Sequence, residues 1–389
     1  MASIEKLHIL RFRNLNDQYL EPNKKINLFI GENGQGKTNL IESIYYLSHN
    51  RSFKTKNTKE LIPFNEDFIQ ISAFVDSLKV VLKKSKTTNS ILIDDQKIAT
   101  NSKLTQHLPI QIISPDRGFI VGGTPKLKRS YLDWGVYHEK TDISKTYRDY
   151  NKGLKNINSL LSKNIGALEE WFAQIAPLSV EISIARKEYI NKLLKILDSD
   201  YFKKLSGLLD LDNRFELKLQ SGWTKDLDGL EKEKVYNHLV NNKKLFIRTK
   251  YLSHGPHKAS IDFSLNKQDE VFLSRGEQKT ASIVFWILQV LILVEQNNSP
   301  IILIDDISSE LDQKKINLLI DFFVGLDVQI FITDIGNTLI SIDEKNAATF
   351  EINNGHITRK TYWFFLKEIA VKKHKILTYQ LAEKCLFVV

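Results

Sequence analysis

The sequence predicts an α/β protein in which a parallel core sheet and an antiparallel β subdomain are interrupted by an inserted α-helical arm. Three observations predict this class. The short apolar run Ile26 to Ile30 ends at a glycine-rich loop, and a helical pattern follows. A second apolar run, Ile301 to Ile304, ends at two aspartates. Between them, residues from about 125 to 240 are poor in Gly and Pro and show helical spacing of apolar residues.

The elements are expected in the following order. Residues 4–12 predict an edge strand, residues 26–30 a buried central strand, and the apolar face after Thr38 a helix. Four short strands follow between residues 69 and 114, with a polar hairpin loop at 83–89. After the helical stretch, further elements are expected: strands near 245–251 and 259–265, a long helix at about 275–296, strands at 301–304 and 328–333, and a hairpin at 350–359.

This order predicts four segments. Residues 1–122 form the N-terminal part of a head with a phosphate-binding loop, and residues 123–250 form the helical arm. Residues 251–360 complete the head, and residues 361–389 form an atypical C-terminal tail. We expect this tail to be irrelevant to catalysis.

The composition narrows the class of protein. The chain has 389 residues and a formal net charge of +9, a balance that favours nucleic acid or an anionic membrane as partner. Its one cysteine, Cys385, excludes an internal disulfide and a zinc cluster and favours a reducing compartment. The N-terminus lacks the apolar core of a signal peptide. The longest apolar run, Ser282 to Val294, predicts a buried helix, so we expect a cytoplasmic protein without a membrane span.

The glycine-rich loop predicts a site for ATP and Mg²⁺. Its glycines let consecutive backbone N–H groups turn inward around an anion, next to the positive end of a helix. Lys37 is expected to reach the β and γ phosphates, and Thr38 to hold Mg²⁺. The residues expected to contact the nucleotide here are Gly31, Glu32, Asn33, Gly34, Gln35, Gly36, Lys37, Thr38 and Asn39.

The paired aspartates predict the catalytic side of that site. Parallel strands deliver their ends to the sheet edge where ligands bind. We expect Asp305 to be the carboxylate on the Mg²⁺ side and Asp306 to polarise the attacking water.

The segment Leu273-Ser274-Arg275-Gly276-Glu277 has two interpretations. Ser274 and Glu277 are spaced as a capping box at a helix start. The segment also resembles the signature motif of ABC-type ATPases, which completes the γ-phosphate site of an opposite subunit. That resemblance implies catalytic and nucleotide contacts from Ser274, Arg275 and Gly276, and Glu277 then opposes phosphate unless it caps the helix. Asp312 similarly resembles a D-loop aspartate or an N-cap.

Together, the motifs resemble the RecF family of bacterial recombination proteins, within the ABC/SMC-like ATPase superfamily. The residues that carry the resemblance are Arg11 to Asn14, Gly31 to Leu40, Ser52 to Thr55, Ser114 to Asp116, Arg129 to Asp133, Gly255 to His257, Leu273 to Gly276, and Asp305 to Asp312. They cover residues 4 to 360 in the expected order.

The resemblance implies an ABC-type ATPase head and a weak DNA-dependent ATPase. It implies a homodimer that forms on ATP and binds double-stranded DNA near single-strand gaps. With RecR and RecO, such proteins help load RecA on gapped DNA, in support of replication and the SOS response. Two other interpretations stay open: a transporter-type ABC ATPase subunit, and a DNA clamp that binds ATP but barely hydrolyses it. The threonine Thr333, where transporter ATPases carry a switch histidine, counts against the first.

Clusters of basic residues are the candidates for DNA contacts. The first two clusters are expected to line one surface, although each can equally be solvated surface. They comprise Arg51, Lys54, Lys56 and Lys59 after the phosphate-loop helix, and Lys83, Lys84 and Lys86 in the hairpin. A third cluster, Lys126, Lys128 and Arg129, begins the arm.

Overall fold

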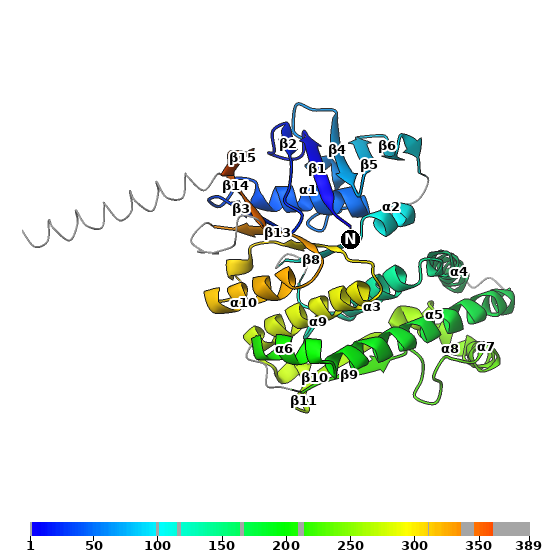
Figure 1. Ribbon diagram of the computed structural model, residues 1–389. Coiled ribbons are helices and arrows are strands. Elements are labelled where there is room, and N and C mark those ends of the chain that lie inside the picture. The colour runs from blue at the N-terminus through cyan, green and yellow to red at the C-terminus, as the bar shows by residue number, and fades with distance from the viewer. Residues whose placement is uncertain are drawn as a thin grey trace, which may run out of the picture.

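The core of the molecule is a six-stranded sheet whose strand order is β15-β14-β3-β13-β12-β8 (Figure 1). Five strands run parallel, and β15 pairs antiparallel with β14 at one edge. The strands are β3 (Ile26–Ile30), β8 (Ile110–Ile113), β12 (Ile301–Ile304), β13 (Gln329–Asp334), β14 (Ala347–Asn353) and β15 (His356–Lys360). The computed structural model describes residues 2–98, 101–114, 118–163, 167–208, 214–309, 311–335 and 346–360.

Both faces of the core sheet are covered, which explains the continuous apolar runs of its strands. On one face, α1 (Lys37–His49) packs with the antiparallel subdomain in one hydrophobic cluster. On the other face, α9 (Arg275–Glu295) and α10 (Gln313–Val324) pack in a second cluster. The short helix α2 (Asn101–His107) lies beside α1.

The antiparallel subdomain has the strand order β2-β1-β4-β5-β6-β7. Its strands are β1 (Ile4–Leu10), β2 (Gln18–Leu20), β4 (Phe68–Val75), β5 (Leu78–Ser85), β6 (Asn89–Ile93) and β7 (Gln96–Lys97). The expectation of an edge strand at the N-terminus is wrong, because β1 lies between β2 and β4. Lys83 and Lys84 lie within β5, so the hairpin loop is shorter than expected.

The helices of the expected arm form the lower part of the view in Figure 1, together with a three-stranded sheet of order β11-β10-β9. These elements are α3 (Pro125–Glu139), α4 (Ile143–Lys163), α5 (Leu168–Leu197), α6 (Asp200–Leu208), β9 (Phe215–Gln220), α7 (Lys232–Asn241), α8 (Lys243–Thr249), β10 (Ser260–Leu265) and β11 (Gln268–Asp269). Short 3₁₀ turns occur at η1 (Thr58–Leu61), η3 (Pro256–Lys258), η4 (Glu270–Phe272) and η5 (Ile307–Ser309). The expected boundary at residue 250 falls between β9 and its partner β10.

The strand expected near residues 245–251 is wrong, because this segment forms α8. Its apolar run, Leu245 to Ile247, is too short for its period to distinguish a strand from a helix. Tertiary packing decides the outcome: Phe246 is fully buried in a cluster of arm helices and contacts Phe172 edge-on.

A buried network joins the arm helices to the segment before β10. Arg186 of α5 is 4% exposed, forms an ion pair with Asp133 of α3, and donates from Nη1 to the carbonyl of Pro256. Tyr150 of α4 hydrogen-bonds His257 at 2.7 Å. Two sequence motifs, Arg129 to Asp133 and Gly255 to His257, therefore lie close together, and their contacts stabilise the packing of the arm helices.

One described helix, α9, is long and apolar enough to cross a membrane, but 78% of its apolar window is buried inside the protein. It packs against the core sheet, so it is a core helix. The tail at 361–389 lies outside the described residues, as do Pro115, Asp116 and Glu310 of the sequence motifs.

Candidate nucleotide site

The predicted phosphate loop lies between β3 and α1, the strand–loop–helix context that such a loop requires. Gly34 and Gly36 adopt left-handed backbone conformations, with φ of 82° and 116°. A Cβ on Gly31 would lie 2.4 Å from the carbonyl oxygen of Ile352 in β14. The first glycine is therefore needed for close packing, and the later two for the turn.

Contacts from distant segments hold the loop in place. Asn14 donates to the carbonyl of Gly34 at 3.4 Å and accepts from the Asn39 side chain at 2.6 Å. The Gly355 N–H donates to the carbonyl of Gln35 at 2.9 Å. Asn14 belongs to the motif after β1, so the structure gives that motif a positioning role in the loop.

Lys37 is held inside the loop. Its Nζ donates to the carbonyls of Gly31 and Glu32 at 2.6 and 2.8 Å, and the residue is 8% exposed. Burial lowers the pKa of Lys37, while the nearby carboxylates of Asp306, Asp334 and Asp305 oppose that shift. The lysine is thus placed between carbonyls at the loop and carboxylates at the ends of β12 and β13.

The pairing of parallel strands brings Thr38 and Asp305 together. The Thr38 hydroxyl donates to Asp305 Oδ1 at 3.1 Å, and the Thr333 hydroxyl donates to the same oxygen at 2.7 Å. Asp305 is 4% exposed. One hydroxyl and one carboxylate are hard oxygen ligands, and this donor set fits Mg²⁺.

Asp306 has a strained backbone and a buried carboxylate oxygen. Its φ is 51°, a left-handed conformation, and its N–H donates to Thr333 Oγ1 at 3.0 Å. Its Oδ1 atom is buried and has no hydrogen-bond partner among the described residues. Such an oxygen, near Lys37, is suited to a water molecule or to the Mg²⁺ shell.

Sequence reasoning missed Asp334. This aspartate ends β13, pairs in register with Ile30 at the end of β3, and is 1% exposed. Its charge acts on Lys37, as the charges of Asp305 and Asp306 do. The available signal was the same one that identified Asp305, a carboxylate directly after an apolar strand.

The segment that resembles a signature motif is a complete capping box. Ser274 accepts from the Glu277 N–H at 3.3 Å, and the Glu277 side chain accepts from the Ser274 N–H at 2.8 Å. The hydrogen bond with Ser274 lowers the pKa of Glu277. Nothing lies within 4 Å of a Cβ built on Gly276, so the first turn of α9 is open. Within the described structure, no hydrogen bond or ion pair joins Ser274, Arg275 or Gly276 to the phosphate loop.

Asp312 caps α10, since its side chain accepts from the Lys315 N–H at 2.9 Å. The capping interpretation of this position therefore has a direct structural basis. A further contact of Asp312 across an interface stays a prediction.

The basic candidates differ in their surroundings. Arg51, Lys54, Lys56 and Lys59 are exposed after α1. Lys83 lies over the Phe68 ring at 4.0 Å, Lys84 is half-buried, and Lys86 forms a long ion pair of 3.9 Å with Asp67. Lys128 is buried with Glu270, and Arg129 donates to the carbonyl of Ala259. The proposal of Lys128 as a DNA contact is wrong, because its side chain faces the interior.

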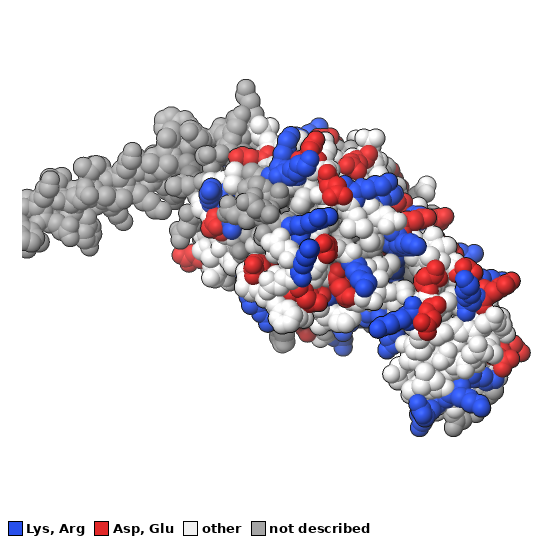
Figure 2. All heavy atoms as spheres, turned by 90° about the horizontal axis from the view of Figure 1, so that it is seen from below, with Lys and Arg blue, Asp and Glu red and all other residues white. Residues whose placement is uncertain are grey.

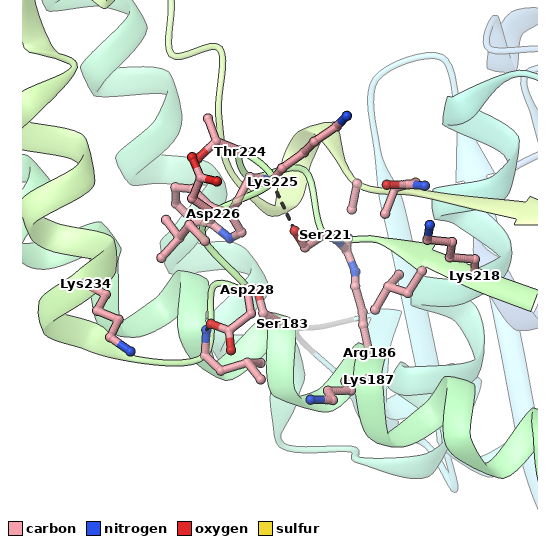
Figure 3. Close-up of a pocket in the computed structure, with 16 residues that line it drawn as sticks. Ser183, Arg186, Lys187, Lys218, Ser221, Thr224, Lys225, Asp226, Asp228 and Lys234 are labelled. Carbon is pink, nitrogen blue, oxygen red and sulfur yellow. Dashed lines mark hydrogen bonds between the residues drawn. The ribbon is translucent and has the colours of Figure 1, made fainter.

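A cavity of about 830 Å³ lies in the lower part of the molecule, away from the phosphate loop. Figure 3 shows Arg186 and Lys187 of α5, Lys218 of β9 and Lys225 of the following loop around it, with Asp226 and Asp228 among them. None of the residues predicted for nucleotide binding lines this cavity.

The chain matches the family model described as the RecF/RecN/SMC N terminal domain over residues 3–358. It is 32% identical to a DNA replication and repair protein RecF of Psychromonas ingrahamii, over 92% of this chain and 99% of that protein. A RecF of Clostridium botulinum is 30% identical with the same coverage. The chain belongs to the RecF family.

Solved structures agree with this membership. A RecF recombination mediator of the RecFOR pathway, solved with ATP, superimposes with a TM-score of 0.81 and 26% identity, covering 92% of this chain and 98% of that chain. The Smc head domain of Pyrococcus furiosus superimposes with a TM-score of 0.52 at 13% identity, and this likeness concerns the fold alone. As a RecF-family member, the chain has the ABC/SMC-type ATPase fold and a role in recombinational repair.

Proposed function

We propose that this protein is an ATP-dependent DNA-binding protein of recombinational repair. It dimerises on ATP, binds double-stranded DNA near single-strand gaps, and helps RecR and RecO load RecA, in support of replication and the SOS response. The main observation in support of this proposal is that Lys37, Thr38 and Asp305 converge at one sheet edge. They do so in a chain that matches the RecF/RecN/SMC family model over residues 3–358.

The site has residues for each part of phosphoryl transfer. The loop N–H groups and Lys37 bind the phosphates, and Thr38 with Asp305 holds Mg²⁺, which supplies charge neutralisation when bound. Asp306 orients the attacking water through its buried carboxylate. The open first turn of α9, with Ser274, Arg275 and Gly276, completes the γ-phosphate site of a second copy.

The activity that we propose is that of a weak, DNA-dependent ATPase of the cytoplasm. Because hydrolysis needs residues from two copies, nucleotide turnover is coupled to dimerisation on DNA. A DNA clamp that barely hydrolyses ATP is the second candidate, favoured by the short side chain and strained backbone of Asp306. Membership of the RecF family argues against the alternative of a transporter-type ATPase subunit.

Sedimentation with and without ATP, in the presence of gapped duplex DNA, tests the proposal. We expect a monomer that becomes a DNA-bound dimer only with ATP and Mg²⁺. The Lys37→Met variant should remain monomeric, because it loses the phosphate-binding ammonium group. Lys24→Met is a matched control at an exposed lysine and should dimerise normally. A chain that stays monomeric in ATP and ignores DNA would contradict the proposal.

A further inference from the structure

The solvent face of α4 is strongly basic. Five of the nine exposed residues of this helix are cationic, namely Lys145, Arg148, Lys152, Lys155 and Lys163, and one is acidic, Asp149. The spacing of three, four and three residues from Lys145 to Lys155 places these side chains on one face. The buried residues of α4 lie on the opposite face, towards α5 and α8.

These cations are available for a partner. Within the described part of the chain, none of the five side chains makes an ion pair or hydrogen bond. By contrast, Lys83 and Lys86 in the head already contact Phe68 and Asp67. Figure 2 shows a face of the molecule on which acidic and basic side chains are interspersed, so an uncompensated basic row is not a general property of this surface.

The chemistry of the row favours a phosphate backbone over a protein surface. Protein interfaces are centred on buried aromatic and apolar anchors. Every exposed residue of α4 is charged or polar, including Asn151, Ser159 and Ser162, and interfaces with nucleic acid are polar and positively charged. From Lys145 to Lys155 the helix rises about 15 Å, a length over which duplex DNA carries about nine phosphates.

We infer that the exposed face of α4 binds the phosphate backbone of duplex DNA. The inference rests on the proposed DNA-binding function and assigns part of it to the arm. Lys145, Arg148, Lys152 and Lys155 are the contacting residues, and the contact is independent of base sequence because it involves phosphates only.

The test is a double charge reversal, Arg148→Glu with Lys152→Glu, measured by fluorescence anisotropy with a labelled duplex at several salt concentrations in ATP. We expect at least about tenfold weaker binding and a salt slope smaller by about two, because two phosphate contacts are lost. The matched control is Lys24→Glu with Lys204→Glu, which makes the same charge change at exposed lysines outside α4. It should bind DNA nearly as the parent does.

Two further measurements make the result decisive. Binding of a fluorescent ATP analogue should be unchanged in the α4 variant, which shows that the chain is folded, and Arg148→Lys should retain DNA binding. Unchanged affinity and salt slope in the reversal variant would overturn the inference. A reversal variant that binds duplex normally but no longer binds polyglutamate, when the parent does, would also overturn it, because that result indicates an acidic protein partner. A parent chain that binds no duplex in ATP would instead contradict the proposed function itself, and the inference with it.

Discussion

Thr38 donates its hydroxyl to Asp305 across 3.1 Å, and this contact joins the first turn of α1 to the end of β12. The two residues are far apart in the sequence. They meet because β13 pairs in parallel with both β3 and β12, so all three strands end at one edge. A ligand set for one cation is thus assembled by sheet topology, before any nucleotide contributes an oxygen.

Asp306→Asn should separate binding from hydrolysis. Asparagine tolerates the left-handed conformation of this position and keeps the size of the side chain, but it cannot accept a proton from water. We expect ATP binding and dimerisation to persist, while phosphate release slows by about 10²-fold or more. The variant should therefore accumulate as a dimer on DNA, measurable by sedimentation. Asp321→Asn, the same change at an exposed aspartate of α10, is the control and should turn over ATP as the parent does. If the Asp306→Asn variant hydrolyses ATP at the wild-type rate, another residue orients the attacking water.

Glu277→Gln should strengthen ATP-dependent dimerisation. Glutamine preserves the capping box, so α9 should keep its start. The substitution removes a negative charge from the helix end that is proposed to approach the γ-phosphate of a second copy. We expect half-maximal dimerisation at a lower ATP concentration, measured by sedimentation. Glu295→Gln, at the other end of α9, is a control for the loss of one carboxylate. Weaker dimerisation in Glu277→Gln would show that the carboxylate has a favourable role.

The sequence predicts that the loop and Asp305 converge, because both signals are local, and the structure places Thr38 within hydrogen-bond distance of Asp305. The glycines, Lys37 and Thr38 lie within one short segment, and the apolar strand Ile301 to Ile304 leads directly into Asp305 and Asp306. Asp334 was missed because a single aspartate after a strand has no distinctive spacing. Only the register of β13 beside β3 shows that its charge reaches Lys37.

Three predictions from the sequence are wrong at places where tertiary packing decides the local structure. Lys128 is one of several lysines in a helical stretch, and nothing local shows that it faces Glu270. Leu245 to Ile247 is apolar enough for a strand, but Phe246 packs among helices and fixes α8. The position of β1 inside its sheet depends on β2, a strand of three residues that sequence patterns rarely reveal.

Acidification should destabilise the fold well before the carboxylates titrate. Burial lowers the pKa of both His138 and His257 to about 4. Between about pH 6.5 and 4 the unfolded chain therefore binds more protons than the folded chain, so stability falls as pH falls through this window. Each histidine contributes a loss that approaches about 1.4 kcal/mol per pH unit, and below the window the loss is constant.

Urea unfolding across this pH range tests the role of the buried histidines. His138→Phe keeps an aromatic ring beside Trp134 but cannot be protonated, so its stability should decline less steeply with acid. His107→Gln, at an exposed histidine, is the control and should follow the parent. A His138→Phe profile parallel to that of the parent would show that His138 is not a source of the acid sensitivity.

Lys128→Met should cost stability without affecting DNA affinity. Lys128 and Glu270 form a buried ion pair, and the Glu270 carboxylate also accepts from the Gly122 N–H at 2.7 Å. Removing the lysine leaves a buried carboxylate without its counter-charge, at a cost of about 3–5 kcal/mol in the free energy of unfolding. The double variant Lys128→Met with Glu270→Gln should recover part of this loss in urea unfolding. Weakened DNA binding by folded Lys128→Met would restore the sequence-based assignment.

Charge reversal in the head should distinguish exposed candidates from those already paired. Arg51→Glu with Lys56→Glu alters two exposed cations after α1, whereas Lys83→Glu with Lys86→Glu alters lysines that contact Phe68 and Asp67. If both clusters line one DNA surface, each pair should weaken duplex binding and reduce the salt slope by about two.

The contacts of the second pair make the expected result unequal. A cation that lies over an aromatic ring or beside a carboxylate must give up that contact before it binds phosphate. We therefore expect the larger loss of affinity from Arg51 and Lys56, measured by anisotropy at fixed ATP with the Lys24→Glu, Lys204→Glu chain as control. Equal losses would place both clusters at the DNA. No loss from either would leave α4 as the basic surface that binds duplex, a result directly comparable with the reversal of Arg148 and Lys152.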